Sequence, residues 1–596
     1  MVLSNSFQSL LERCIMPKYL VKRALWLVIV VVVLVGIWQS FVGVANLSVY
    51  FQHGANPASA LNIVPNVPPD LSVGLTWTAD DTDTGRVLER ATRTEIESVY
   101  LRAWLQWNLS FVKNAPYGLK TYFVGPALAA VTNDVQTIAI QGWQVGQVDT
   151  AHTLHLHFYS ADGSIISFTD EQAVVVHIIR DKTGAIVLTQ ESEARYQVVM
   201  LLEDGNWRVR HWVRTQDTVL DGASAVRTPP NFVGRVGANL TLNGQNYSMT
   251  GVNYYPKDTP WDKFWLNYAP KTTERDVTLI RSLGMNTVRI FLPFEQFGGP
   301  HIGQATSAIV PTNTVREPLV KLADFLRRAA AHGLKVIITL FDFRTDYSLL
   351  LWPQSDRYLE TLLTHFKDTP TILAWDIKNE PDLDYKNNGK EVVNAWLAHT
   401  ARLARRTDPH HLLTIGWSTY KAAETQVAAI DVVSFHYYAP ATALPQAYTA
   451  LQSAVFGRPI LLTEFGLSTW NSPFFPGGHN EAEQAAYYAD ILHFWRTSGG
   501  AGYLAWTLYD FSTIPANVVG GLPWQSGPQR GFGLIKSDGT FKAAARVLTQ
   551  NGLDNTPPVS LWERTIKPFN GTLLVGVLLA LQATMWVRRW RGRKRA

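Results

Sequence analysis

Residues 372–381 read ILAWDIKNEP, and the rest of the chain is best interpreted as scaffold and partner for Glu380 in this stretch. The run from Ile372 to Ile377 is typical of a short buried strand, and it leads directly into the polar residues Asn379 and Glu380. Pro381 has no backbone N–H and a fixed φ, so the strand cannot continue past it. Glu380 is therefore predicted to lie at the carboxyl end of a strand. A glutamate before a proline also occurs as a simple turn cap, so this motif alone does not settle its role.

The pattern around this stretch repeats along the chain. After a predicted hairpin with Asn243-Gly244 as its turn, strand-like runs alternate with helical segments. The strand-like runs are 251–256, 286–294, 335–343, 372–381, 412–419, 432–440, 460–466 and 503–511. The helical segments are 272–283, 315–332, 356–367, 390–406, 420–428, 442–456, 480–498 and 540–549. Eight such pairs predict an α/β fold, a (β/α)8 TIM barrel over residues 232–550.

A second glutamate occupies a matching position. Glu464 ends the seventh predicted strand as Glu380 ends the fourth. In a closed barrel the carboxyl ends of the strands surround one mouth, which is where barrel enzymes carry their chemistry. Two carboxylates facing each other across a sugar-sized cleft are the smallest set of catalytic groups that glycoside hydrolysis needs. One protonates the leaving oxygen, and the other attacks the anomeric carbon or activates water.

The residues at the strand ends resemble a known family, glycoside hydrolase family 5, the cellulase-like members of clan A. The resemblance covers residues 232–550 and keeps the family's order along the strands. The residues that carry it are Arg289 in NTVRI, Asn379-Glu380-Pro381, His436-Tyr437-Tyr438, Glu464 in LLTEFG and Trp506 in YLAWTL.

The resemblance implies a retaining mechanism, with Glu380 as acid/base and Glu464 as nucleophile, their carboxyl groups about 5–5.5 Å apart. It also implies roles for their neighbours. Arg289 would keep Glu464 ionised and oriented, and Asn379 would donate to the sugar 2-OH.

The remaining site residues are predicted to contact Glu464 or the sugar. Tyr438 would donate to Glu464, His436 would line the floor near the scissile bond, and Trp506 would offer an apolar face to a sugar ring. Family members usually carry a histidine at the end of strand three, where this chain has LFDF, so Asp342 or Arg344 is expected to take over substrate contacts there. Aromatic residues at other strand ends, Tyr254 and Trp417 among them, are candidates for stacking along a glycan.

The sequence predicts no cofactor and no metal in the barrel, because no His/Asp cluster there has ligand spacing, and the family needs none. His155 and His157 lie on one face of a predicted strand before the barrel and suit a metal, but no third ligand is evident, and a solvated strand face explains them as well.

Residues 86–220 form a separate predicted α+β domain. A helix over 87–112 is followed by strand-like runs at 134–148, 151–160, 173–180, 195–201 and 206–214. A long helix before a curved antiparallel sheet resembles the nuclear-transport-factor-2-like fold, and this domain is a candidate surface for a protein partner. Linkers are predicted at 46–85 and 221–231.

Both ends of the chain carry an apolar run beside a basic cluster. Residues 24–45 and 571–587 are predicted transmembrane helices, the second reached through a linker at 551–570. The basic tails at 1–23 and 588–596 place both termini in the cytoplasm and the domains between them outside the cell membrane. The only cysteine, Cys14, then lies inside. The body between the tails is mildly acidic, which argues against a nucleic-acid partner.

These observations predict a membrane-anchored retaining glycoside hydrolase that cleaves a β-linked polysaccharide or oligosaccharide of the β-glucan or β-mannan type. Two alternatives remain open. A catalytically silent glycan-binding barrel would keep the fold, and a transglycosylase would pass the glycosyl group to a sugar instead of water.

Overall fold

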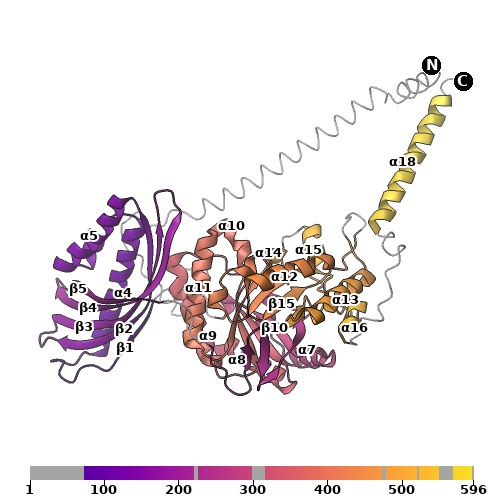
Figure 1. Ribbon diagram of the computed structural model, residues 1–596. Helices are drawn as coiled ribbons and strands as arrows, with labels where there is room; N and C mark the ends of the chain where they lie inside the picture. The colour runs from indigo at the N-terminus through magenta and orange to yellow at the C-terminus, as the bar shows by residue number, and fades with distance from the viewer. Residues whose placement is uncertain are drawn as a thin grey trace. The chain divides into compact units, whose positions relative to one another are not determined.

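The computed structural model of the protein describes residues 73–220, 226–297, 316–472, 478–519, 522–549 and 568–593 (Figure 1). The predicted tail at 1–23 and the predicted transmembrane helix at 24–45 lie outside the described residues. The same holds for most of the linker at 46–85 and for residues 551–567.

Eight parallel strands form a closed barrel. They are β9 (Met249–Asn253), β10 (Thr287–Pro293), β11 (Lys335–Asp342), β12 (Ile372–Asn379), β13 (Leu412–Trp417), β14 (Val433–Tyr437), β15 (Ile460–Phe465) and β16 (Gly502–Ala505). Strand β9 pairs with both β10 and β16, which closes the ring. Val, Ile and Leu dominate because the strands are covered on both faces. The predicted (β/α)8 barrel is confirmed.

Helices cover the outside of the strands (Figure 1). The longer ones are α7 (Pro270–Ser282), α8 (Arg316–Ala331), α9 (Trp352–Phe366), α11 (Lys390–Thr407), α12 (Leu444–Ala454) and α13 (Glu481–Ser498). Shorter elements are α6 (Asp262–Leu266), η4 (Phe294–Gln296), η5 (Leu349–Leu351), η6 (Pro381–Asp384), α10 (Tyr385–Asn388), η9 (Ala441–Ala443), α14 (Ala516–Val519), α15 (Pro523–Gln529) and α16 (Ala543–Thr549).

One predicted barrel helix is wrong. Residues 420–428 hold only two 3-10 turns, η7 (Ala422–Glu424) and η8 (Val427–Ala429). Thr425 between them is extended and Gln426 has a left-handed backbone with φ 56°, so the helical hydrogen-bond ladder cannot run through.

A small antiparallel sheet precedes the barrel, with strands β6 (Val233–Val236), β7 (Asn239–Leu242) and β8 (Gln245–Asn246). The turn between β7 and β8 is at Asn243 and Gly244, as predicted, and both have positive φ, which two-residue hairpin turns of this hand require. Val233 and Leu240 pack with Met249 and other barrel residues in a shared apolar cluster. The hairpin is therefore part of the barrel's core.

Residues 73–220 contain two helices and a five-stranded sheet. The elements are β1 (Gly74–Trp77), α4 (Arg90–Val112), η3 (Leu119–Thr121), α5 (Gly125–Gln141), β2 (Gln144–Tyr159), β3 (Ile165–Arg180), β4 (Ile186–Glu203) and β5 (Asn206–Val219). The sheet order is β1-β2-β3-β4-β5, with β1 parallel to β2 and the other pairs antiparallel. Trp104 and Trp212 lie in the core between helix and sheet, with ring centroids 4.8 Å apart.

The predicted strand at 134–148 is wrong over most of its length. Residues up to Gln141 belong to α5, and β2 begins only at Gln144. Val131 and Val135 are buried one helical turn apart, and Gly142 ends the helix with a left-handed backbone at φ 71°. The sequence interpretation took the helix's last apolar residues for the start of the strand.

This α+β domain contacts the barrel through buried charges. Glu191 of β4 accepts hydrogen bonds from His399 Nδ1 at 2.9 Å and Arg402 Nη2 at 2.7 Å, both on α11. His399 Nε2 lies 2.9 Å from Asp356 of α9. Burial opposes the charge on His399, but Asp356 and Glu191 raise its pKa to about 10. Val148, Val176 and Ile178 of the sheet join the barrel's apolar cluster. The described contacts therefore connect the two domains, each of which also has an apolar core of its own.

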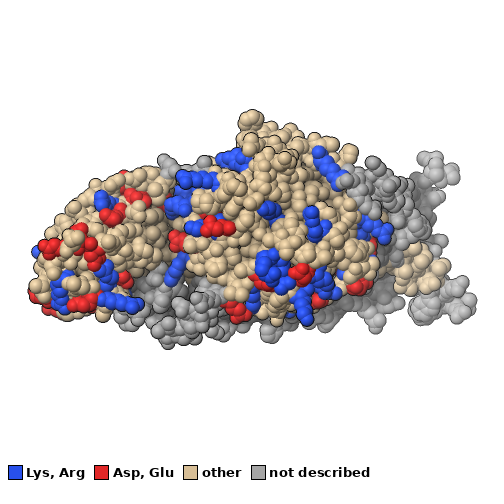
Figure 2. Space-filling view, turned by 90° about the horizontal axis from the view of Figure 1, so that it is seen from below, with Lys and Arg blue, Asp and Glu red and all other residues tan. Residues whose placement is uncertain are grey.

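The second predicted transmembrane helix falls within α18 (Pro568–Arg593). Within the described part of the chain, none of the helices combines the length and apolarity that crossing a membrane requires, so that prediction is not supported. Figure 2 shows basic and acidic side chains interspersed over the described residues of one face.

Candidate active site

Glu380 stands directly after β12, at the start of the η6 turn. Its backbone is left-handed, with φ 47° and ψ 49°, a conformation that non-glycine residues adopt at a cost of order 1–3 kcal/mol. The Glu380 N–H donates to the Gly416 carbonyl at 2.6 Å, which fixes this turn against β13. The turn holds the Glu380 side chain at the barrel mouth, 27% exposed.

Glu464 lies near the end of β15 and is paired in register with His436 of β14. Arg289 Nη1 donates to Glu464 Oε1 at 2.6 Å, and the Tyr438 hydroxyl donates to Oε2 at 2.7 Å. Each carboxylate oxygen thus has its own donor, so the group is held in one orientation.

Arg289 is fully buried and binds four side chains at once. Its Nη2 donates to Asp376 Oδ2 at 2.6 Å and to Asn379 Oδ1 at 2.8 Å. Its Nη1 also donates to Asn253 Oδ1 at 3.0 Å. Burial opposes the guanidinium charge, but Asp376 and Glu464 outweigh it and raise the Arg289 pKa. Because Arg289 occupies the Asn379 oxygen, the Asn379 amide N–H groups remain available as donors.

His436 connects the two glutamates. Its Nδ1 lies 2.8 Å from Glu380 Oε1 and 3.5 Å from Glu464 Oε2. Burial disfavours the charge on Glu380, but the hydrogen bond and charge of His436 prevail and lower the Glu380 pKa. One oxygen of each glutamate and one His436 nitrogen all lie within 4.8 Å of one another. Because His436 Nδ1 contacts both carboxylates, the two groups are close enough to act on one glycosidic bond.

Asp342 ends β11, where the family pattern usually has a histidine. It is buried, and the Tyr255 hydroxyl donates to its Oδ2 at 3.2 Å. Burial raises the Asp342 pKa from 3.8 to about 6, although Lys378 and Arg289 act in the opposite direction. A carboxyl with this pKa is partly protonated near neutral pH.

The predicted aromatic residues divide into two groups. Trp506 lies beside the site and meets Tyr255 and Phe291 edge-to-face, with ring centroids 6.4 and 6.0 Å away. Tyr254 is fully buried outside this group, with its hydroxyl on Asp276 of α7 at 3.0 Å. Trp417 is also fully buried. The contacts described above connect every predicted site residue except Tyr254, whose hydroxyl contacts Asp276, and Trp417, whose ring has no exposed face for a glycan.

Three residues of the site were missed by the sequence interpretation. Asp376 and Asn253 bind Arg289, and Gly416 lies against Arg289, Asp376 and His436. A Cβ on Gly416 would lie 2.8 Å from Arg289 Nη2 and 3.3 Å from His436 Nε2. The role of Asp376 could have been predicted from the sequence, because a carboxylate in the middle of a buried strand requires a cation partner.

This arrangement suits nucleophilic displacement at a sugar carbon. One carboxylate is held rigidly by two donors, as a nucleophile requires, and the other carries an imidazole contact suited to proton exchange. The three groups Glu380, His436 and Glu464 are also close enough to hold a metal ion, although an ion there would occupy the position of the reacting atoms.

Residues 240–512 match the family described as Cellulase (glycosyl hydrolase family 5), a range that includes all eight barrel strands. The chain is 25% identical over 366 residues to mannan endo-1,4-β-mannosidase 1 of Oryza sativa subsp. japonica, covering 48% of this chain and 81% of the rice protein. Among solved structures it is similar to the exo-β-1,4-mannosidase Op5Man5 from Opitutaceae bacterium strain TAV5, with a TM-score of 0.42, 20% identity, and coverage of 54% of this chain and 61% of that one. It is also similar to the endo-1,4-β-mannanase from Rhizomucor miehei, with a TM-score of 0.40, 18% identity, and coverage of 55% and 99%.

Proposed function

We propose, from the premise that residues 240–512 form a glycosyl hydrolase family 5 catalytic domain and hence an O-glycosyl hydrolase, that the protein cleaves β-linked mannan with retention of configuration. The observation that carries this proposal is the pair Glu380 and Glu464, with carboxylate oxygens within 4.8 Å of each other across the barrel mouth.

In the first step Glu464 attacks the anomeric carbon while Glu380 gives its proton to the leaving oxygen, so that the glycosidic bond breaks and a glycosyl-Glu464 ester forms. In the second step Glu380 takes a proton from water, and the water oxygen displaces Glu464 from the same carbon. Arg289 and Tyr438 orient Glu464 for attack, and they receive the carboxylate again when the ester is hydrolysed.

The neighbouring side chains supply binding. The Asn379 amide is positioned to donate to the sugar 2-OH, a contact that strengthens in the transition state. Trp506 offers a ring face to the sugar at the cleavage point. Asp342 replaces the usual strand-three histidine and is suited to accept from a sugar hydroxyl when ionised.

The choice of mannan over glucan is supported by the mannosidase relatives of the barrel. The preference for mannan is tested by measuring the reducing sugar that the purified protein releases from β-mannan, β-glucan and xylan. The Glu464→Gln and Glu380→Gln variants are measured in the same way. Glu424→Gln, an exposed glutamate after β13, is the matched control. We expect mannan oligosaccharides from the wild type and the control, and less than about 1% of that release from either site variant.

Proton NMR of the first product formed determines the mechanism, because retention gives the β-anomer first. An α-anomer would contradict the double displacement. Binding of mannan without any release would identify a silent glycan-binding barrel, and products longer than the substrate would identify transglycosylation.

We further propose that the barrel works at the outer face of the cytoplasmic membrane. The proposal is supported by the apolar run at residues 24–45 with basic residues before it, and by the basic cluster at 588–595. Protease added to intact spheroplasts should degrade the barrel. Protection from protease until the spheroplasts are lysed would place the barrel inside and contradict this.

A further inference from the structure

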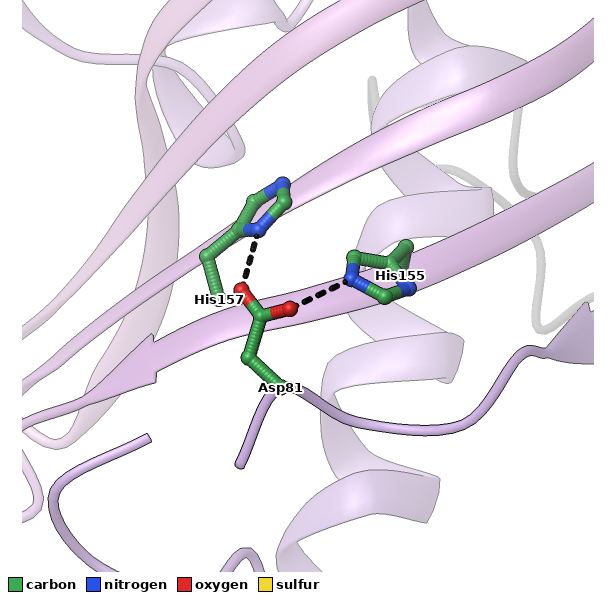
Figure 3. A group of neighbouring side chains, drawn as sticks. All are labelled: Asp81, His155 and His157. Atoms are coloured by element: carbon green, nitrogen blue, oxygen red, sulfur yellow. Dashed lines mark hydrogen bonds and ion pairs between the residues drawn. The ribbon is translucent and has the colours of Figure 1, made fainter. Parts of the chain in front are cut away.

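We propose that Asp81, His155 and His157 of the α+β domain form a binding site for a divalent transition-metal ion of the zinc class. Figure 3 shows the Asp81 carboxylate between the two imidazole rings. Asp81 Oδ1 lies 2.9 Å from His155 Nε2, and Oδ2 lies 2.8 Å from His157 Nδ1. One atom from each of the three side chains lies within 4.8 Å of the other two.

The fold explains how these residues meet. Alternate residues of a strand share a face, so His155 and His157 of β2 both point outward while Leu154 and Leu156 are buried. Asp81 arrives from the segment after β1, which pairs in parallel with β2. The Asp81 N–H donates to the Leu156 carbonyl at 3.1 Å, so backbone pairing positions the third ligand beside the first two.

Each imidazole is also fixed from its other side. His155 Nδ1 lies 2.7 Å from the Thr78 hydroxyl, and His157 Nε2 lies 2.7 Å from the Thr169 hydroxyl. Metal-binding histidines commonly use the second ring nitrogen in this way, which directs the lone pair of the first nitrogen toward the ion. A solvated strand face does not require a hydroxyl partner behind each ring.

The donor set selects the kind of ion. Two imidazoles and a carboxylate suit Zn²⁺ and neighbouring transition metals, whereas Ca²⁺ and Mg²⁺ prefer oxygen ligands. The side chains of His155, His157 and Asp81 are 23%, 41% and 46% exposed, so water or an outside ligand can complete the coordination.

Metal binding would replace the protons that now bridge nitrogen and oxygen. Ligand atoms around tetrahedral Zn²⁺ stand about 3.3 Å apart, a few tenths of an ångström wider than the present contacts. The two nitrogen–oxygen contacts therefore need to widen only slightly, whereas the ligand atoms as a set, now within 4.8 Å of one another, have to close around the ion. Binding releases protons to solvent.

Isothermal titration of tag-free, chelator-treated full-length protein with ZnCl₂ tests the site, and CoCl₂ provides a visible absorption signal for the same ligands. We expect one site in the wild type. Affinity should fall at least tenfold in Asp81→Asn, His155→Gln and His157→Gln, and it should be unchanged in His211→Gln, an exposed histidine of β5. Thr169→Val keeps all three ligands and should weaken binding several-fold.

Thermal unfolding with and without ZnCl₂ shows whether each variant still folds. The wild type should gain stability from Zn²⁺, and a folded variant without the site should not. Unchanged affinity in His155→Gln and His157→Gln, or loss of the site in Glu380→Gln instead, would overturn the proposal. In the second case the ion would belong to the barrel mouth.

Discussion

Arg289 Nη1 lies 2.6 Å from Glu464 Oε1, and the Arg289 side chain is fully removed from solvent while that of Glu464 keeps only 6% exposure. A buried carboxylate can be held ionised and in place only if a cation and further donors satisfy it. Arg289 contacts Glu464 and Asp376 at the same time, at 2.6 Å each.

Replacing Arg289 with lysine should lower kcat by about 100-fold, because a lysine ammonium cannot reproduce the planar set of guanidinium N–H donors that positions Glu464. Arg289→Met should in addition cost about 3–5 kcal/mol of unfolding free energy, since two carboxylates lose their buried partner. Steady-state kinetics and urea unfolding measure the two effects. Arg327→Lys, at a 66% exposed position on α8, is the control and should change neither quantity.

His436→Gln should move the alkaline limb of the pH profile of kcat/KM to higher pH. His436 lowers the Glu380 pKa, and an acid catalyst loses activity as the pH rises through its pKa. Removing the imidazole therefore lets Glu380 keep its proton to higher pH, although the overall rate falls. A limb that stays in place, or moves to lower pH, would show that His436 does not control this proton.

Asp342→Asn should change how stability depends on pH. Burial raises the Asp342 pKa from 3.8 to about 6, so between about pH 4 and 6 the folded protein holds a proton that the unfolded chain has lost. The folded protein accordingly loses stability as the pH rises through this window, by up to about 3 kcal/mol for this group.

The amide that Asp342→Asn introduces cannot ionise, so the variant should lose less stability than the wild type between pH 4 and 7 in urea unfolding. Asp368→Asn, at an exposed position after α9, should follow the wild type. Identical pH dependence in Asp342→Asn and wild type would show that Asp342 does not titrate in this range. If Asp342 also binds substrate, the same variant should raise KM for mannan oligosaccharides.

Gly416→Ala should reduce activity by at least tenfold. The new Cβ would stand 2.8 Å from Arg289 Nη2 and 3.1 Å from Asp376 Oδ2, so both atoms have to move away from it. Because Arg289 also holds Glu464, the displacement reaches the nucleophile. Gly74→Ala is the control, since its Cβ would meet nothing nearer than 3.9 Å. Wild-type kcat in Gly416→Ala would mean that the arginine network tolerates rearrangement.

The sequence predicted the residues that stand at strand ends better than those that support them. Glu380 and Glu464 follow from strand periodicity and the family pattern, because the carboxyl ends of a closed parallel barrel meet at one mouth. Asp376 lies inside β12 and Asn253 ends β9, and the role of both depends on which arginine faces them across the barrel. Which side chains contact Arg289 depends on how the barrel closes and on the register between its strands. The periodicity of a single strand carries no information about either.

The same limit explains the errors outside the site. The apolar residues of 134–141 are spaced in a way that fits either the end of a helix or the start of a strand. In the structure they end helix α5, because Gly142 adopts the left-handed backbone that terminates a helix. Asp81 escaped notice as a partner of His155 because 74 residues separate them. Only the parallel pairing of β1 with β2 brings the two together.

The contact of Glu191 with His399 and Arg402 has a consequence for dividing the protein into fragments. A barrel expressed from residue 232 onward would keep both cations of α11 but lose the carboxylate that neutralises them. It would also expose the apolar surface that Val148, Val176 and Ile178 now cover. The linker at 221–231 divides the sequence into two domains, but the folding unit extends across it.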